Sequence, residues 1–367
     1  QKTAYEIYQC DWSSDVCSSD LKIRVNRILF AGGGTAGHIE PAWAVSQVWR
    51  SRNPGDEIAF LGTKSGLEVT LIPERDGTLY LIPKVTAPRK LGFSALVFPF
   101  QLLNSVSKTI ALVKKFDVVV GFGGYVAGSA YIAAALLRKP IVVHDQNAKV
   151  GLANKFGAIF TKEIAVAYPN SGLSGARVVG NPLKSEIVKA ASQSDWAAAR
   201  AKAKAALGVS GELVLILGGS SGSVAVNKVI SETNFGDRTV IHSVGKANEL
   251  PEGSATYKPV AYIEDMATAL LAADLVISRS GAIACSEFAA LGKYALFIPL
   301  PIGNGEQALN ADELVAAHKA EVLPQSQFTS AWLSQNIERL IKQGSVEPLG
   351  TSLNAAEQIA DCIGRVI

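Results

Sequence analysis

The feature that most constrains the fold is a repeated succession of a short apolar run, a glycine-rich turn and an amphipathic stretch. The run at 28–30 leads into GGGTAGH at 32–38 and then into a helix-like stretch at 41–50. The run at 118–120 leads into GFGGYVAG and an alanine-rich stretch at 129–137. The runs are apolar throughout, as expected for parallel strands that helices cover on both faces. The pattern therefore predicts an α/β fold built on parallel sheets.

The same succession occurs twice along the chain. It pauses at 185–207, a stretch rich in Lys, Ala and Ser that indicates one surface helix beside a linker. It resumes at 213–217, with a glycine cluster of its own at 218–223. The further strand candidates are 58–61 and 141–144 in the first series and 239–244, 275–278 and 296–299 in the second. A chain of 367 residues has the length of two domains, and we predict an N-terminal domain over 22–184 and a C-terminal domain over 185–351.

The first 21 residues stand apart from this pattern. They show no strand or helix period and lack the basic and apolar regions of a signal peptide. Their tract CDWSSDVCSSDL resembles translated sequencing-adapter DNA, so we interpret residues 1–21 as a non-native extension, with a genuine disordered extension as the alternative. They carry one lysine against four acidic residues, so the net charge of +3 becomes +6 without them. That balance does not indicate bulk nucleic-acid binding. The remaining Cys285 and Cys362 suit a reducing cytoplasm.

One apolar stretch, LGFSALVFPFQLL at 91–103, is too short and broken to predict a membrane span. Basic residues flank it at Arg89, Lys90, Lys108, Lys114 and Lys115. One interpretation is a buried core helix. The other is an interfacial patch, in which apolar side chains meet acyl chains and lysines meet anionic head groups.

The first glycine cluster could bring backbone close to a ligand. Gly32, Gly34 and Gly37 fit G-x-G-x-x-G, which aims helix N-terminal N–H groups at an anion. A dinucleotide site also needs an acidic residue after the next strand, but that strand ends in LGT at 61–63. His38 closes the cluster. At a helix N-terminus its pKa would be lowered and its neutral ring could act as a base, with a capping or packing histidine as the alternative.

Other motifs point to ligand binding in the second half. GGSSGS at 218–223 would cradle a diphosphate, or form a plain strand-to-helix turn. In SRSGAIACSE at 278–287, Glu287 could accept hydrogen bonds from both ribose hydroxyls, or complement a helix dipole. Gln307 and Asn310 are three apart and would share a helix face, which could equally be an ordinary solvated face.

The tetrad HDQN at 144–147 leaves a buried strand in the first half. It predicts a binding edge or a solvated loop, since open α/β sheets bind ligands at the carboxyl ends of their strands. No metal-binding spacing and no Walker lysine occur in the sequence, and Cys285 is best interpreted as a small packed residue.

Together these residues resemble the MurG family of membrane-associated glycosyltransferases, from about residue 23 to the C-terminus. The motifs, in order, are GGGTAGHIEPA, GFGGYVAG, HDQN followed by GLAN, VVGNP, LGGSSGS followed by Asn227, YIEDM, SRSGAIACSE and EQALNA. The resemblance implies the GT-B fold, in which two Rossmann-like parallel-sheet domains face a cleft. It also implies that a last helix, at about 352–367, crosses back to the N-terminal domain.

The resemblance implies an activity as well. This is the inverting transfer of N-acetylglucosamine from UDP-N-acetylglucosamine to the C4 hydroxyl of undecaprenyl-pyrophosphoryl-N-acetylmuramyl-pentapeptide, which converts lipid I to lipid II in peptidoglycan biosynthesis. No metal or other cofactor is expected. The expected partners are the nucleotide sugar, the lipid-linked acceptor and an anionic membrane surface, without nucleic acid, and cell-wall assembly proteins are further candidates. The expected location is peripheral, on the cytoplasmic face of the plasma membrane, and 91–103 falls on the family's membrane-associating patch.

The resemblance also assigns roles to residues. His38 would be the catalytic base, and Tyr125 and Asp145 would lie on the acceptor side. The residues expected to bind UDP-N-acetylglucosamine are Thr35, Ala36, Gly37, Asn147, Lys184, Ser220, Ile263, Ala282, Ile283, Ala284, Cys285, Ser286, Glu287, Gln307 and Asn310. Among them Ser220 would contact the diphosphate, Ile263 the uracil and Glu287 the ribose, while Gln307 and Asn310 would contact the sugar. Lys184 stands where the family commonly has arginine, and it or Arg279 would help to stabilise the leaving UDP.

Two other function classes remain open at this stage. An NAD(P)-dependent oxidoreductase would use the G-x-G-x-x-G turn, but the missing acid after the second strand disfavours it. A non-catalytic UDP-sugar-binding membrane subunit would keep Glu287 and Gln307 but would lack a usable base. The presence of His38 argues against that second class.

Overall fold

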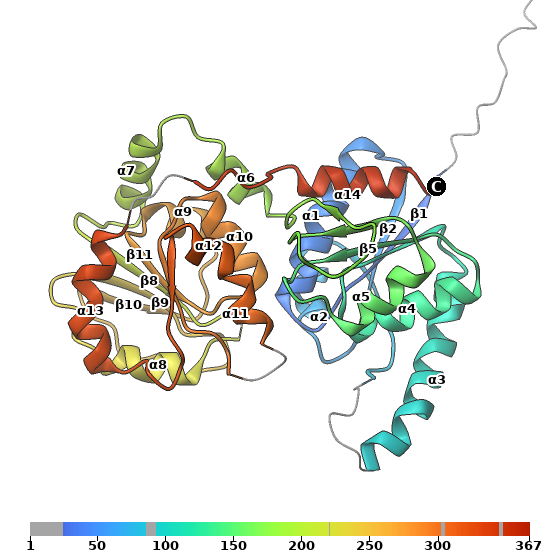
Figure 1. Cartoon of the computed structure of the whole chain (residues 1–367), viewed down its shortest axis with the longest axis horizontal. Coiled ribbons are helices and arrows are strands. Elements are labelled where there is room, and N and C mark those ends of the chain that lie inside the picture. Colours follow the sequence, from blue (N-terminus) through green and yellow to red (C-terminus); the bar gives the residue numbers. More distant parts are fainter. Residues whose placement is uncertain (1–24, 86–92, 220, 302–304, 345–347) are drawn as a thin grey trace, which may run out of the picture.

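The computed structural model describes residues 25–85, 93–219, 221–301, 305–344 and 348–367. The predictions for residues 1–21, Arg89, Lys90 and Ser220 fall outside these ranges. Two parallel sheets organise the described chain, one in each half, which confirms the predicted α/β class (Figure 1).

The first sheet has the order β3 (Thr78–Leu81), β2 (Glu57–Gly62), β1 (Arg27–Ala31), β4 (Val118–Gly121), β5 (Ile141–Asp145), β6 (Ile164–Val166) and β7 (Arg177–Val178). The second has the order β10 (Tyr257–Val260), β9 (Thr239–Ser243), β8 (Leu213–Leu217), β11 (Leu275–Ser278), β12 (Ala295–Phe297) and β13 (Ala320–Val322). Each begins at a central strand, winds to one side, and then crosses to the other. Such a switch of direction leaves a crevice at the carboxyl ends of the central strands, where open α/β sheets bind ligands.

Helices cover both sheets. Those connected with the first sheet are α1 (Ala36–Arg52), α2 (Glu68–Leu71), η1 (Pro73–Arg75), α3 (Phe93–Val113), α4 (Gly124–Leu136), α5 (Leu152–Gly157) and η2 (Ala158–Phe160). Those that follow are α6 (Ser185–Ala191), α7 (Trp196–Ala206), α8 (Val224–Ser231), α9 (Met266–Ala272), α10 (Ala282–Ala290), α11 (Glu306–Asn310), α12 (Asp312–Ala316), α13 (Ser330–Lys342) and α14 (Ala355–Gly364). The last helix, α14, lies on the first half beside α1 (Figure 1), where Ile359 and Ile363 share a buried cluster with Trp49.

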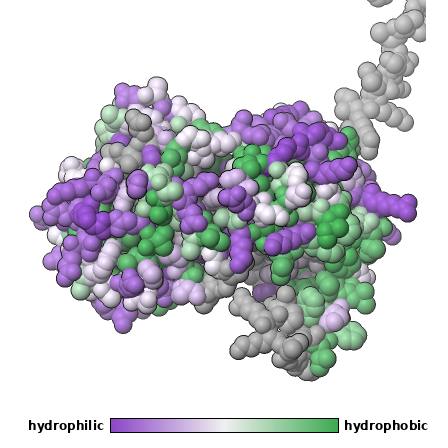
Figure 2. Space-filling view, in the orientation of Figure 1, coloured by the Kyte–Doolittle hydropathy of each residue, from purple (hydrophilic) through white to green (hydrophobic). Residues whose placement is uncertain are grey.

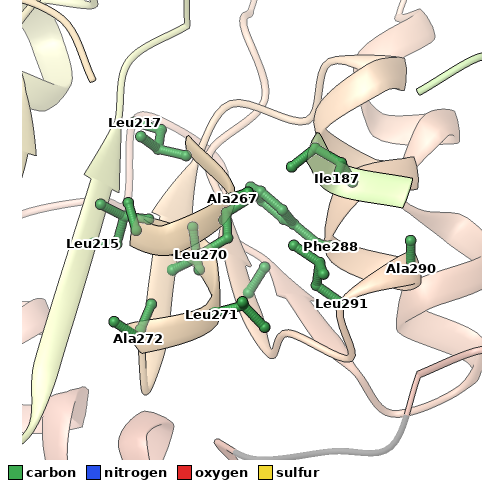
Figure 3. Close-up of a cluster of buried hydrophobic side chains, with 14 of the residues drawn as sticks. Ile187, Leu215, Leu217, Ala267, Leu270, Leu271, Ala272, Phe288, Ala290 and Leu291 are labelled. Carbon is green, nitrogen blue, oxygen red and sulfur yellow. The ribbon is translucent and has the colours of Figure 1, made fainter. Parts of the chain in front are cut away.

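The central strands show why the apolar runs form buried sheets. All five residues of β8 are buried, and they alternate between two core clusters on opposite faces. Leu215 and Leu217 pack on one face with Leu270 of α9 and Phe288 of α10 (Figure 3), while Ile216 belongs to the other cluster. Full burial on both faces is the physical reason that these strands are continuously apolar.

Two local predictions need correction. The stretch 185–207 forms two helices rather than one, because the Asp195 carboxylate accepts a hydrogen bond from the Ala198 N–H and starts α7 afresh. α3 extends beyond the apolar stretch 91–103 to Val113. Its segment Leu96–Val113 has a mean hydropathy of 1.4 and is 22% buried, so by length and composition alone it could cross a membrane.

Candidate active site

The carboxyl edges of the two sheets meet at Asn310. Its side-chain oxygen accepts a hydrogen bond from the Ala148 N–H at 2.9 Å. Its amide nitrogen lies 3.3 Å from both the Asn147 side-chain oxygen and the Ser280 carbonyl. The Tyr168 hydroxyl donates to the Asn310 carbonyl at 3.2 Å. Because Ala148 follows β5 and Ser280 follows β11, these bonds join the functional edges of both halves. The Asn310 amide is fully used here, so its contact with a sugar stays a prediction.

Asn181 forms a second junction, and the sequence analysis gave it no role. Its amide nitrogen is 2.9 Å from the Ser286 hydroxyl and 3.2 Å from the Gln146 carbonyl, so it also bridges the two halves. Its oxygen is buried without a hydrogen-bond partner within the described ranges, as is the Ser280 hydroxyl. The available signal was a polar residue held between glycine and proline in the GNP motif.

His38 lies in the first turn of α1, which follows the first glycine-rich turn. Its Nδ1 is 3.2 Å from the Thr35 hydroxyl. Burial lowers the pKa of His38, while Asp145, the Gly33 carbonyl and Glu68 act in the opposite direction. Ala36 and Gly37 are the first two residues of α1, so their N–H groups lack the helical partners that later residues have.

Gly123 leaves space beside the other nitrogen of His38. It has a φ of +91°, a conformation that favours glycine, and a Cβ there would lie 3.4 Å from His38 Nε2. Tyr125 follows in the first turn of α4, and its hydroxyl is 3.6 Å from where a Cβ of Gly34 would lie. The Lys84 ammonium lies 5.9 Å from the centre of the Tyr125 ring. The structure therefore gathers His38, Tyr125 and the turn before α1 in one place.

Glu68, the first residue of α2, ties this region together and was missed by the sequence analysis. Its carboxylate accepts hydrogen bonds from the Gly34 N–H at 2.8 Å and the Thr63 N–H at 2.7 Å. The Thr63 hydroxyl adds a third at 3.3 Å. An acidic residue is therefore bonded to the loop after β2, five positions beyond Thr63. Unlike the acid of a dinucleotide site, it also binds the glycine-rich turn, through the Gly34 N–H.

Three of the four residues of the HDQN tetrad form an internal network rather than a solvated loop, and the binding edge stays a prediction. His144, Asp145 and Gln146 are all buried, and burial lowers the pKa of His144 to about 4. The Asp145 carboxylate accepts from the Asn147 and Gly151 N–H groups and from the Asn154 amide, at 2.9 to 3.0 Å. Burial raises the pKa of Asp145 despite these bonds. Asp145 therefore holds the 145–151 loop in shape, and its predicted contact with an acceptor stays a prediction.

The second glycine-rich turn, between β8 and α8, is open where the first is filled. Gly219 has a φ of +87°, and a Cβ there would meet nothing within 4 Å. Gly222 is instead packed under the Val244 carbonyl, which leaves no room for a side chain. Ser223 caps α8 through its hydroxyl, which accepts from the Val226 N–H. The backbone at Gly219 is thus accessible, while the packing of Gly222 and the cap at Ser223 hold the turn in place.

Arg279 supports this second turn from below. Its side chain is buried and donates to the Ser223 hydroxyl and the Gln325 side-chain oxygen, both at 2.7 Å. It also donates to the carbonyls of Ile298 and Pro299. Burial lowers the pKa of the Arg279 guanidinium. All four of these acceptors are neutral. The positive charge of Arg279 therefore lies next to Ser223, the last residue of the turn.

Glu287 of α10 lies near Lys184, the residue that precedes α6. Burial raises the pKa of Glu287 to about 7, which the charge of Lys184 opposes. The Lys184 ammonium is 3.5 Å from the Glu40 carboxylate, which Arg75 also holds through two hydrogen bonds. Burial disfavours the charge of Lys184, but Glu40 outweighs it and the pKa of Lys184 is raised. A cavity of about 380 Å³ opens beside this cluster.

The remaining predicted donor residues lie on the second half. Ile263 is buried in the loop between β10 and α9, and residues 282–286 form the first turns of α10. Burial raises the pKa of Cys285 well above its usual range, as expected for a packed thiol. The Gln307 side-chain oxygen accepts from the Leu300 N–H at 2.9 Å. In the described ranges, no group of three or more His, Cys, Asp or Glu residues is placed to hold a metal ion.

A surface on the first half, here called the apolar flank, exposes large hydrophobic side chains (Figure 2). It comprises Leu96, Phe100 and Leu103 of α3, Leu136 of α4, and Leu152, Phe156, Ile159 and Phe160 of α5 and η2. α4 packs between α3 and α5, which joins these groups. Only the α3 part carries a signal in the sequence, because α5 and η2 are too short to show a periodic apolar face.

Comparisons with known proteins agree with this architecture. The Glycosyltransferase family 28 N-terminal domain matches residues 28–166, and the Glycosyltransferase family 28 C-terminal domain matches residues 213–365. The UDP-N-acetylglucosamine–N-acetylmuramyl-(pentapeptide) pyrophosphoryl-undecaprenol N-acetylglucosamine transferase of Corynebacterium diphtheriae is 42% identical over 357 residues, covering 93% of this chain and 97% of that protein. The identically named protein of Streptomyces coelicolor is 42% identical over 323 residues, covering 84% and 88%.

A solved structure extends the match to three dimensions. The crystal structure of Acinetobacter baumannii MurG has a TM-score of 0.70 and 27% sequence identity, and the match covers 93% of this chain and 99% of that one. The two family models lie on the two sheets found here, and the relatives match over nearly their full length. The chain therefore has the GT-B fold and belongs to the MurG family of glycosyltransferases.

Proposed function

We propose that this protein transfers N-acetylglucosamine from UDP-N-acetylglucosamine to undecaprenyl-pyrophosphoryl-N-acetylmuramyl-pentapeptide. Its relatives are named for that transfer and match it along almost their whole length. One observation carries the proposal at the level of chemistry. A histidine with a lowered pKa and an open glycine-rich turn occupy the facing edges of two joined sheets. A group-transfer enzyme needs both a base for the acceptor and a cradle for the leaving group.

In the reaction, the acceptor C4 hydroxyl attacks the anomeric carbon of the donor sugar. A new carbon–oxygen bond forms as the bond from that carbon to the diphosphate oxygen breaks, and UDP leaves with the electron pair. Attack from the face opposite the diphosphate inverts the anomeric centre and gives a β-1,4 linkage. The hydroxyl proton passes to His38. A proton on Nδ1 that faces Thr35 would leave Nε2 free to accept it, on the side that Gly123 keeps open.

The leaving UDP would be stabilised by the second half. The backbone at Gly219 and the N-terminus of α8 would offer N–H groups to the diphosphate. Arg279 adds a positive charge beneath the turn without touching the ligand. Lys184, which lies near Glu287, would be a second cation for the leaving group. These groups together support a transfer that needs no metal ion, which is part of the proposal.

Glu287 would hold the ribose in its ionised form, because a carboxylate accepts hydrogen bonds from two hydroxyls at once. With its pKa near 7, donor binding at neutral pH would favour loss of its proton. Gln307 and Asn310 would then contact the sugar. For Asn310 this requires that its bonds to Ala148 and Asn147 open, so sugar binding would be coupled to movement between the halves.

The lipid-linked acceptor would be reached by peripheral binding to the cytoplasmic face of the plasma membrane. The apolar flank is the surface suited to this role, with exposed Lys108 and Lys155 on α3 and α5. α3 would lie at the interface rather than span the bilayer. Its Ser105 hydroxyl is 3.1 Å from the Ser129 hydroxyl of α4 and also donates to the Pro83 carbonyl, so its other face is packed on the domain.

The alternatives fare less well. For an oxidoreductase, the Gly34 N–H that would face a dinucleotide phosphate is already bonded to Glu68. For a non-catalytic sugar-binding subunit, nothing would require a histidine with a lowered pKa beside a glycine that carries no side chain.

The test is a transfer assay with purified protein, UDP-N-acetylglucosamine and a short-chain lipid I analogue, run with and without a chelator. We expect a disaccharide product with a β-1,4 linkage at equal rates in both conditions. Absence of product would contradict the transfer, an α-linked product would contradict inversion, and loss of activity with chelator would contradict metal independence.

A further inference from the structure

Glu68 is a buried charge with a specific set of partners. Its side chain is 1% exposed, although it begins the short helix α2 near the surface. Its three hydrogen-bond donors, two backbone N–H groups and one hydroxyl, are all neutral. Burial of a carboxylate is costly, because hydrogen bonds must offset the loss of its hydration.

The chain makes room for this carboxylate with three glycines. A Cβ at Gly33, Gly62 or Gly66 would lie under 3.0 Å from an atom of the Glu68 side chain. Gly33 belongs to the turn after β1, and the other two flank the loop after β2. Both loops are therefore shaped around the same side chain.

The position of the carboxylate corresponds to that of a bound anion. In Rossmann-type domains, the glycine-rich turn after the first strand directs N–H groups at a phosphate. Here the Gly34 N–H of that turn, with φ at +93°, donates to Glu68 instead. The protein thus supplies from its own chain the negative charge that a ligand supplies elsewhere.

We propose that Glu68 is a positioning residue that acts as an internal substitute for a phosphate at the first glycine-rich turn. It fixes the turn that carries Thr35 and His38, and it occupies the Gly34 N–H that would otherwise be free to bind the donor diphosphate. The catalytic consequence rests on the proposed function; the structural consequence does not.

Two carboxylates affect the titration of His38. Asp145 at the end of β5 and Glu68 on α2 both raise the pKa of His38 against the effect of burial. Tyr125 on α4, with the Lys84 ammonium over its ring, is a further titratable group beside the turn. Removing the Glu68 charge therefore lowers the pKa of His38 further, an effect that a purely structural side chain would not have.

The test compares Glu68→Gln with the wild type. Glutamine keeps the volume but presents one oxygen, so Gly34 and Thr63 cannot both keep an acceptor. We expect kcat to fall roughly 10- to 100-fold, since displacement of a catalytic group by about 1 Å can cost 100-fold. The Kd for UDP should stay within about twofold. In NMR titrations, the His38 ring, assigned by comparison with His38→Gln, should titrate at lower pH than in the wild type. Glu74→Gln, which removes an exposed carboxylate from η1, should change none of these values.

A wild-type measurement keeps the proposal testable if Glu68→Gln does not fold. Inorganic pyrophosphate is added to protein labelled with ¹⁵N-glycine, and we expect the Gly219 amide signal to move while the Gly34 signal stays. Movement of Gly34, or a folded Glu68→Gln with unchanged kcat and unchanged His38 titration, would overturn the proposal. A wild type that transfers no sugar would contradict the proposed function alone, because the NMR results do not depend on activity.

Discussion

The two glycine-rich turns occupy the same place in two similar sheets but have opposite support. Each follows the first strand of its sheet and opens the first helix, β1 to α1 and β8 to α8. Beneath the first turn lies a carboxylate, Glu68, bonded to Gly34. Beneath the second lies a guanidinium, Arg279, bonded to Ser223. The Glu68 side chain occupies the space at the first turn, whereas the second turn leaves open space at Gly219.

This difference indicates how one fold supports two tasks. The backbone motif sets the geometry of each turn, but the charge beneath it decides what each can bind. Burial lowers the pKa of His38 beside the first turn. Glu68 occupies the Gly34 N–H of that turn, which is then not available to a diphosphate. Positive charge under the second attracts one. We therefore assign the acceptor chemistry to the first half and the donor diphosphate to the second.

The largest expected effect comes from His38→Ala, which tests whether the first half carries the chemistry. We expect kcat to fall by about 1000-fold, since a general base contributes about 100- to 10,000-fold. The Kd for UDP should stay within about twofold, because uracil, ribose and diphosphate would lie on the second half. Steady-state kinetics and UDP calorimetry measure the two values. Normal turnover in this variant would contradict the assignment of the acceptor chemistry to the first half.

Glu287→Gln tests whether the second half binds the donor, because it should change UDP binding, which His38→Ala should leave unchanged. Loss of a charged acceptor for the ribose should weaken UDP binding about 10- to 100-fold, since a hydrogen bond to a charged group contributes about 1.5–3 kcal/mol. His38→Ala is the control, because it should leave the same Kd intact. An unchanged Kd in Glu287→Gln would remove the ribose assignment.

The pH dependence of UDP binding is a second test of the contact between Glu287 and the ribose. Burial raises the pKa of Glu287 to about 7, and the ribose is held by the ionised form. As pH falls through 7, the carboxyl group gains a proton that UDP binding must displace, so the affinity should drop, by at most tenfold per pH unit. Calorimetry between pH 8 and pH 6 measures this. Glu287→Gln should lack the additional loss, and a wild type with the same profile as that variant would contradict the assignment.

The apolar flank provides a third difference between the halves. Replacing Leu96, Phe100 and Leu103 with serine should reduce binding to anionic lipid vesicles at least about tenfold, since each CH₂ buried in lipid contributes about 0.8 kcal/mol. Val224→Ser removes a similarly exposed apolar side chain from α8 of the second half and serves as the control. Equal vesicle binding by the wild type and the triple variant would refute a membrane role for α3.

The smallest expected effect is that of Lys184→Arg. An arginine fork can bond two phosphate oxygens, so we expect UDP to bind about two- to fivefold more tightly. Lys189→Arg on the exposed side of α6 is the matched control. Weaker binding would indicate that the pairing of Lys184 with Glu40, rather than with phosphate, is its main role.

The sequence predicted the parts of the fold that local pattern controls. The strands β8 and β11 were located to the residue, because buried central strands are apolar runs bounded by turns. Edge strands β3 and β10 were missed, since they are short and half-exposed and carry no such signal. The break between α6 and α7 was missed because it depends on a single cap at Asp195.

The candidate site was predictable only where a motif is contiguous. His38, Glu287 and both glycine turns could be found because each motif lies within a few residues. Glu68 lies 34 residues beyond Gly34, and Arg279 lies 56 residues beyond Ser223, so their roles depend on pairing across a sheet that no local pattern encodes. The local sequence does not show burial either, which is why a solvated loop at HDQN was one of two interpretations although three of its four residues are buried.

A crystal structure of the UDP complex tests the central claim most directly. We expect the diphosphate within hydrogen-bond distance of the backbone N–H groups of 218–223, the ribose on Glu287, and the Glu68–Gly34 bond intact at the first turn. A diphosphate at the N-terminus of α1, with Glu68 displaced from Gly34, would contradict it.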